Sequence, residues 1–324
     1  MENEKTLNKR ANLGSGLIRE FAMLIILLVI IGVLSILSPK FAQFDNFINI
    51  FKQTAINGIL ATGMAMVILT GGFDLSVGST VGLSGVIAAL LAQGNYPIYV
   101  PIIAAIAVGA AAGLLNGSLV AYCGIPAFVV TLGSQSIIRG LAYVISGGRP
   151  VFGVNKAYEN LAGGKLFGVV PYLVIYLIII VLVVGFVLTK TVYGRRLYVV
   201  GGNEEAAKVS GINVKNMKMS AFMLAGLLSG VAGMLLTSRT VSGTPQTGEG
   251  YELDAIAAVV IGGFSLNGGS GKWYGIIIGA LILSVLGNGL DILGIKSFYQ
   301  LILKGTIVIL AVYLDVRSRK KMSA

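Results

Sequence analysis

Asp74 is the side chain of this sequence best placed to do unusual chemistry, because it stands in a short Gly- and Ser-rich break between two long apolar runs. Burying a carboxylate in such a place costs free energy, so a carboxylate found there often has a functional role. Two roles fit Asp74: a gate or hydrogen-bonding group in a pathway, and a cap on the helix that begins after Ser76. We favour the cap. Asp254 opens another apolar run and is also interpreted as a cap, while Asp291 lies near the end of a later run.

Five uncharged hydrogen-bonding residues lie on the apolar runs themselves. Side chains of this kind can bind a neutral, hydroxyl-rich solute, which gains little from charges. They can also hydrogen-bond one helix to the next, at about 1 kcal/mol or less per bond in a membrane. We favour the second role for each and expect one or two of them to line a pathway. They are Asn57, Asn116, Ser134, Gln135 and Asn288.

The sequence lacks the residues that most enzymes and metal sites use. It has no histidine, and its single cysteine, Cys123, excludes a disulfide framework and a cysteine metal cluster. The nearest approach to a phosphate-binding loop is Gly271-Lys272, but Leu266 replaces its first glycine and Trp273 replaces its serine or threonine. We therefore expect no enzyme activity, metal or cofactor in this chain itself.

Composition identifies the elements that must position these residues. Apolar residues make up 56% of the chain and charged residues 11%, whereas a soluble domain carries roughly a quarter charged residues. We predict an all-α polytopic membrane protein with about ten transmembrane helices. The third and eighth are short and are candidates for broken or re-entrant helices. The predicted spans are 22–38, 51–70, 79–93, 98–122, 128–145, 170–189, 219–241, 254–266, 273–293 and 298–314.

A Gly-rich segment occurs twice in the chain, each time where one apolar run ends and another begins. The first copy runs from 71 to 79 and the second from 262 to 270. Six predicted spans separate the two breaks, so both face the same side and the repeat is parallel. Many ion-coupled carriers use inverted repeats instead, which argues against that class without excluding it. The shared glycines are Gly71, Gly72 and Gly78 in the first copy, and Gly262, Gly263 and Gly269 in the second.

Two further glycine patterns predict close helix packing. Gly109, Gly113 and Gly117 recur every fourth residue, as do Gly226 and Gly230. Small residues at this spacing let two helix backbones approach closely inside a membrane. We interpret both patterns as structural.

Lysine and arginine determine the expected orientation. They cluster in the tails 1–21 and 316–324 and in the loop 190–218, and cytoplasmic segments are rich in these residues. Ten spans place all three segments on the cytoplasmic side of a permease domain covering 22–315. We read the first apolar run as an uncleaved span rather than a signal peptide, because no small-residue cleavage site follows it. The net charge of +11 is attributed to this topology rather than to nucleic-acid binding.

The loop 190–218 contains one short, well-defined helix. Asn203 is a good N-cap, and Glu204 and Glu205 then complement the positive end of the helix dipole. Gly211 can adopt the left-handed conformation that ends a helix. A helix of about two turns is marginal alone in water, so it needs a partner to pack on.

The pattern Glu205-Ala206-Ala207-x-x-x-Gly211 resembles the coupling loop in the membrane subunits of bacterial ABC importers. Three neighbouring segments, at 68–79, 194–203 and 250–260, make the resemblance more specific, because they are similar to the ribose-type (monosaccharide) permease family. The similarity extends from about residue 34 to residue 314. Phe73 departs from it, since isoleucine is expected more often there.

The resemblance implies the membrane subunit of a type II-like ABC sugar importer in the bacterial inner membrane. Two copies would form the pathway, an extracytoplasmic sugar-binding protein would deliver the cargo, and a separate ATPase with two nucleotide-binding domains would use ATP and Mg. That ATPase would contact Glu205, Ala206, Ala207 and Gly211. Ribose is the expected cargo. Xylose, galactose, allose, inositol and the furanosyl signal autoinducer-2 remain alternatives, and specificity is expected mainly in the binding protein.

Other functions remain open at this stage. An ion-coupled secondary carrier would need an acid deep in the membrane, and Asp74 is the one attractive candidate. An integral membrane enzyme would need a catalytic cluster, which the sequence does not offer. The loop 146–169 is expected outside, either as a contact for the binding protein or as a plain solvated loop.

Overall fold

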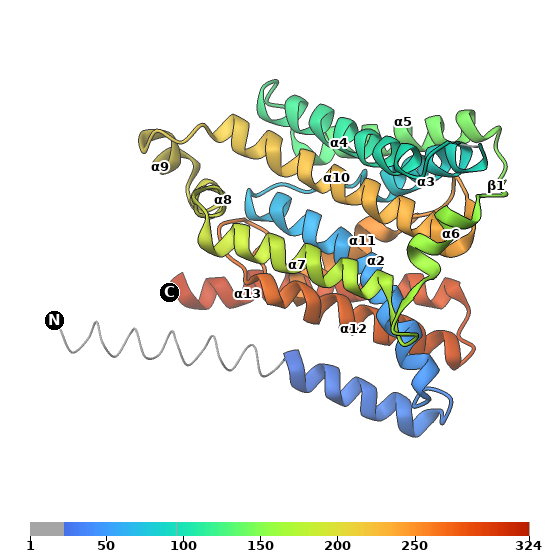
Figure 1. Ribbon diagram of the computed structural model, residues 1–324. Helices are drawn as coiled ribbons and strands as arrows, with labels where there is room; N and C mark the ends of the chain where they lie inside the picture. Colours follow the sequence, from blue (N-terminus) through green and yellow to red (C-terminus); the bar gives the residue numbers. More distant parts are fainter. Residues whose placement is uncertain (1–22, 95, 324) are drawn as a thin grey trace.

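The computed structural model describes residues 23–94 and 96–323, and this part of the chain is mostly helical (Figure 1). Four two-residue strands of this part form two antiparallel pairs. One pair joins β1 (Val151–Phe152) to β4 (Ser242–Gly243), and the other joins β2 (Lys165–Leu166) to β3 (Val170–Pro171). The first helix is Met23–Leu37. The other helices are α2 (Phe44–Leu69), α3 (Val77–Gln93), α4 (Tyr99–Ala121), α5 (Ala127–Ser146), α6 (Lys156–Gly163), α7 (Tyr172–Lys190), α8 (Val192–Gly202), α9 (Glu204–Val209), α10 (Val214–Thr240), α11 (Tyr251–Ile261), α12 (Trp273–Ile292) and α13 (Ser297–Ser323).

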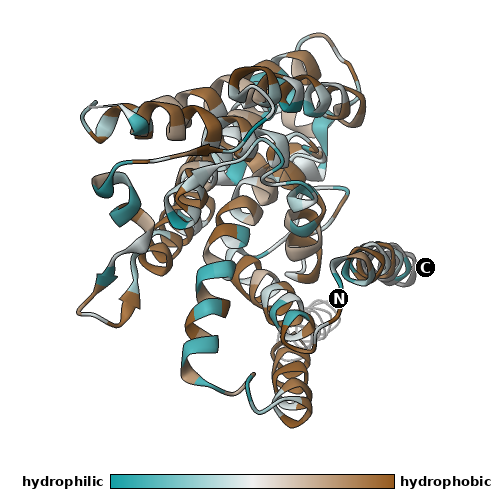
Figure 2. Cartoon of the chain, turned by 90° about the vertical axis from the view of Figure 1, so that its right-hand side faces the viewer, coloured by the Kyte–Doolittle hydropathy of each residue, from teal (hydrophilic) through white to brown (hydrophobic). Residues whose placement is uncertain are grey.

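Each of the ten predicted apolar runs contains a helix, which confirms that these runs are helical. In the described part of the chain, five helices are long and apolar enough to cross a membrane: α4, α5, α7, α10 and α12. The chain is therefore a multi-pass membrane protein, while ten crossings and an internal repeat stay predictions. Figure 2 agrees with a membrane environment, because apolar residues cover much of the outer helices.

The centre of the bundle is built on α2 and α10. The second half of α2, from Gly58 to Leu69, is completely buried. The glycines predicted to allow close packing face one another across α4 and α10: a Cβ added to Gly109 would overlap the carbonyl oxygen of Gly226 and lie 2.8 Å from the backbone nitrogen of Gly230. Larger side chains would force these two helices apart, so this prediction is confirmed.

The chain between α10 and α11 folds back into the protein. Gly248 in this segment lies against Gly78, at the start of α3. Arg139 of α5 donates hydrogen bonds to the backbone oxygens of Pro245 and Thr247, the latter at 2.8 Å. Irregular backbone at membrane depth must be covered by protein in this way. The helices at the third and eighth predicted spans, α3 with 17 residues and α11 with 11, are short as expected, while a broken or re-entrant course stays a prediction.

The two ends of the bundle differ in what they carry. The short helix α9 and the last turns of α13 lie at one end, on the left of Figure 1, while α6 and β1 lie at the opposite end. This agrees with the prediction that the basic loop and the C-terminal tail share one side. The predicted N-terminal tail, 1–21, lies outside the described residues.

Candidate functional site

The helix α9 forms with the caps that the sequence predicts. The side-chain oxygen of Asn203 accepts a hydrogen bond from the backbone nitrogen of Ala206 at 2.9 Å. At the other end, Gly211 has φ +74°, and two backbone bonds close the turn: Gly211 N to Lys208 O and Ile212 N to Ala207 O, each 3.0 Å. This pair of bonds is the Schellman arrangement, which favours glycine at its left-handed position.

One face of α9 is fixed to the protein and the other is exposed. Ala207 is completely buried, and Glu204 accepts a hydrogen bond from Lys218 of α10 at 2.6 Å. The hydrogen bond from Lys218 holds the pKa of Glu204 below its ordinary value. On the outer face Glu205 and Ala206 are exposed, and Val209 is 90% exposed. An exposed valine on a rigid, capped helix suits contact with another protein.

The two Gly-rich breaks touch each other next to α9. The backbone nitrogen of Gly269, in the second break, donates to the carbonyl oxygen of Leu69 at 3.0 Å, just before the first break. Gly201, near the end of α8, fills the remaining space: a Cβ there would overlap the Leu69 oxygen and lie 2.6 Å from Gly269 N. We call this three-way backbone contact the glycine junction. Since Asn203 caps α9 only two residues after Gly201, the junction connects both breaks directly to α9.

A cavity of about 360 Å³ lies beside α9 and the first break. Four charged side chains from α9 and the start of α10 share its lining with the backbone of the first break and the turn between α4 and α5. They are Glu204, Lys208, Lys215 and Lys218.

The carboxylate of Asp74 accepts its hydrogen bonds within the first break. Its Oδ1 accepts from the backbone nitrogen of Ser76 at 2.9 Å and from the Ser76 hydroxyl at 2.6 Å. Asn116 of α4 donates to the same hydroxyl at 2.8 Å. The three residues are buried, and the Asp74 carboxylate closes a short Asx turn immediately before α3. The N-cap position itself is occupied by Ser76, so Asp74 stabilises the entry to α3 without being its N-cap. A gating role for Asp74 or Asn116 stays a prediction.

Gln135 has a partner that sequence reasoning missed. Its Nε2 donates to Oε1 of Glu252 at 3.2 Å, while Oε2 of Glu252 has no hydrogen-bond partner among the described residues. Glu252 is only 8% exposed and lies in the first turn of α11. The sequence signal for Glu252 is an acid at the start of a short apolar run, which is unusual.

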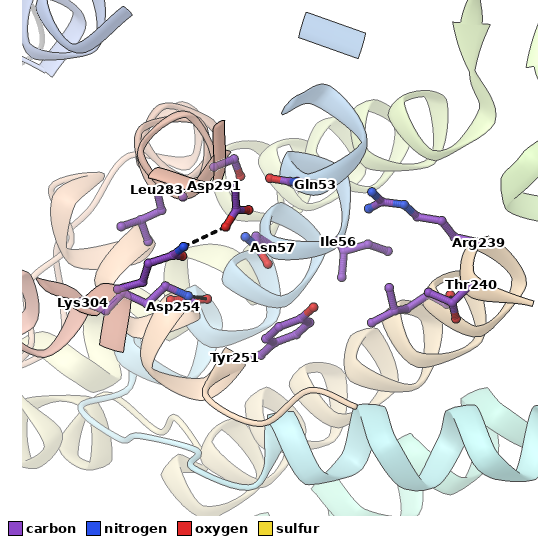
Figure 3. Close-up of a pocket in the computed structure, with 14 residues that line it drawn as sticks. Gln53, Ile56, Asn57, Arg239, Thr240, Tyr251, Asp254, Leu283, Asp291 and Lys304 are labelled. Carbon is purple, nitrogen blue, oxygen red and sulfur yellow. Dashed lines mark hydrogen bonds and ion pairs between the residues drawn. The ribbon is translucent and has the colours of Figure 1, made fainter. Parts of the chain in front are cut away.

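A second cavity, of about 400 Å³, lies between α2, α10, α11, α12 and α13 (Figure 3). The last turns of α10 line it, whereas α9 precedes the first turn of the same helix, so the cavity lies in the half of the bundle away from α9. Asn57 lines it, whereas Asn288 is buried and does not. Asp254 was predicted to be a cap, but α11 begins after Gly250, and the Asp254 carboxylate forms an ion pair with Lys304 of α13 at 2.8 Å. The cap prediction for Asp254 was wrong because α11 begins three residues before it, and the carboxylate pairs instead with a distant lysine that the local sequence does not show.

The remaining acid near this cavity is also engaged. Asp291 accepts a hydrogen bond from Gln300 at 2.7 Å, which links the end of α12 to the start of α13. Within the described residues, no group of three or more histidine, cysteine or acidic side chains is arranged to hold a metal ion.

Comparison with known proteins identifies transport permeases as relatives of this chain. Residues 46–312 match the family model described as the permease component of the branched-chain amino acid transport system. The chain is 43% identical to the ribose import permease protein of Bacillus subtilis, over 99% of this chain and 98% of the relative. It is also 43% identical to the ribose import permease protein of Escherichia coli K12, over 96% and 98%. The D-allose transport system permease protein of the same strain is 37% identical, over 91% of each. No solved structure matches the chain at a significant level.

Proposed function

The chain belongs to the family of permease components of the branched-chain amino acid transport system, and on that premise we propose that it is the membrane subunit of an ATP-driven monosaccharide importer. We propose ribose as the cargo, because two ribose import permeases are 43% identical to this chain over nearly its whole length. Allose, galactose and xylose are the alternatives that other relatives support. Inositol and autoinducer-2 remain open as further cargoes.

In this proposal the helix α9 is the element through which the energy of ATP hydrolysis reaches the chain. Its caps are built from its own sequence, its inner face is fixed by Ala207 and Glu204, and its outer face offers Glu205, Ala206 and Val209. In this proposal a separate ATPase receives that outer face, and Gly211 keeps the turn that presents it. ATP and Mg are bound and used by the partner. Movement of α9 then reaches both Gly-rich breaks through the glycine junction.

The rest of the assembly follows from the same proposal. Two copies of the chain share the pathway in the inner membrane, with both termini in the cytoplasm, and an extracytoplasmic binding protein delivers the sugar. Asn57 is the candidate pathway residue with the best structural support, because it lines the larger cavity. Asp74 already accepts two hydrogen bonds from Ser76, which supports a structural role over an ion-coupling one.

Site-specific cross-linking tests the contact with the ATPase. The exposed Cys123 is first replaced by serine, and Val209→Cys and Phe167→Cys are then made separately. The two positions make a matched pair, because each side chain is 90% exposed and they lie on opposite sides of the bundle in the predicted topology. We expect a short photo-activated cross-linker attached to the new thiol to join the Val209→Cys chain, and not the Phe167→Cys chain, to the ATPase in the assembled complex. Equal cross-linking at both positions, or none at Val209→Cys in an active complex, would contradict the proposal.

A further inference from the structure

The larger cavity contains a buried hydroxyl that has no partner. Ser284 of α12 lines the cavity, is 2% exposed, and makes no hydrogen bond through its Oγ to any described residue. One turn later on the same helix, the side-chain oxygen of Asn288 is also buried and unpartnered. A buried polar group without a partner costs free energy, so each such group calls for an explanation.

Several other buried hydroxyls in the described helices are satisfied locally. Thr54, Thr62 and Ser229 each donate to the backbone oxygen four residues earlier, at 2.8, 2.6 and 2.9 Å. That bond is available to any serine or threonine in a helix. Ser284 makes no such bond within the described part of the chain, and it is one of the residues that line the cavity.

Two neutral amides share the lining of the cavity with Ser284. Gln53 and Asn57 lie one turn apart on α2, and Figure 3 shows both side chains directed into the cavity. The acids around them are already engaged, Asp254 with Lys304 and Asp291 with Gln300. Arg239 of α10 also lines the cavity, so the polar part of its wall combines two amides, a hydroxyl and a guanidinium group. All of these groups can hydrogen-bond to a neutral ligand rich in hydroxyl groups.

The size and position of the cavity also fit a small sugar. Its volume of about 400 Å³ lies within the range of small-molecule sites, roughly 300–1,000 Å³. The ring of Tyr251 adds an aromatic surface to the polar wall, and such rings pack well against apolar faces. At 1.5 Å per residue, about 18 Å of α2 separates Asn57 from Leu69 in the glycine junction.

We propose that this cavity binds one neutral monosaccharide in each copy of the chain, with Ser284, Asn57 and Gln53 as hydrogen-bonding residues. The proposal rests on the proposed function, which it deepens by placing a sugar site within a single subunit. The sugar's hydroxyls supply the partner that the Ser284 hydroxyl lacks, and the site holds the sugar away from the end that carries α9.

Ser284→Ala is the central test, because a structural role and a binding role predict opposite results. The purified chain is titrated with D-ribose, D-allose and D-xylose by equilibrium dialysis, and its apparent melting temperature is measured. We expect Ser284→Ala to melt at or above the temperature of the unaltered chain, because it removes an unsatisfied group. We also expect it to bind the preferred sugar about five-fold more weakly, the value of one neutral hydrogen bond.

Two further variants keep the test interpretable. Ser229→Ala removes a buried hydroxyl that is already satisfied, and it should leave sugar binding unchanged. Asn57→Leu should weaken binding by at least as much as Ser284→Ala. Unchanged binding in both cavity variants, or a lowered melting temperature with normal binding in Ser284→Ala, overturns the inference.

Uptake by the reconstituted complex separates this inference from the proposed function. If the complex takes up sugar and the cavity variants behave like the unaltered chain, the sugar site is wrong and the importer stands. If the chain binds sugar through Ser284 but the complex does not transport it, the site stands and the importer is wrong.

Discussion

Replacing Gly201 by alanine tests whether the glycine junction holds the two breaks and α9 together. An added Cβ at Gly201 would overlap the carbonyl oxygen of Leu69 and lie 2.6 Å from the nitrogen of Gly269. Both obstacles are backbone atoms, so no side chain can rotate away to make room. The neighbouring Gly202 makes an ideal control, because a Cβ there meets nothing within 4 Å.

The size of the effect follows from two opposing terms. Forcing an extra carbon into a packed interior costs about 1–3 kcal/mol. Alanine in a helix gains roughly 0.5–1 kcal/mol over glycine. Gly201→Ala should therefore lower stability by about 1–2 kcal/mol, whereas Gly202→Ala should be neutral or slightly stabilising. In Gly201→Ala the hydrogen bond from Gly269 to Leu69 must lengthen, and this lengthening separates the two breaks.

Thermal unfolding in detergent and sugar uptake by the reconstituted complex are the two assays. We expect Gly201→Ala to melt below both the unaltered chain and Gly202→Ala, and to lose uptake even at temperatures where it is folded. If Gly201→Ala matched Gly202→Ala in melting temperature and in uptake, the junction would not constrain the protein and this reasoning would be refuted.

Three other changes have defined outcomes. Gly211→Val strains a position with φ +74°, so uptake should fall while membrane insertion stays normal; full uptake would count against the role of this turn. Because Lys218 lowers the pKa of Glu204, their pair stabilises the fold above the ordinary carboxyl pKa of about 4.3 and loses that contribution as pH falls through the lower folded value. Lys218→Met should therefore flatten the acid side of the stability–pH curve by at most about 1 kcal/mol, and an unaltered curve would contradict this. Lys304→Met leaves Asp254 buried without its partner, which should cost up to about 3 kcal/mol in denaturant unfolding, and adding Asp254→Asn should restore most of it. No recovery in the double variant would show that the pair is not the cause.

Local chemistry explains what the sequence predicted well. Runs of apolar residues became helices because a backbone in a membrane must satisfy its own hydrogen bonds. Asn203 and Gly211 end α9 through bonds that span only a few residues, so their roles could be read directly from the chain. The expectation that both breaks face one side agrees with the contact between Leu69 and Gly269.

Contacts between distant segments explain what the sequence did not predict. Gly201 belongs to the junction only because two breaks far away in the chain meet there, and nothing near Gly201 indicates this. Asp254 looked like a cap until Lys304, fifty residues later, proved to be its partner. Ser284 was not singled out at all, because a serine in an apolar helix usually bonds to its own backbone, and its missing bond appears only in three dimensions.

Reconstitution of transport tests the central claim most directly. The chain is placed in proteoliposomes with its ATPase and its sugar-binding protein, and accumulation of labelled D-ribose is followed with and without ATP. We expect concentrative uptake only in the complete, ATP-fed system, and none from the chain alone under a proton or sodium gradient. Accumulation driven by an ion gradient with this chain as the sole protein would contradict the account.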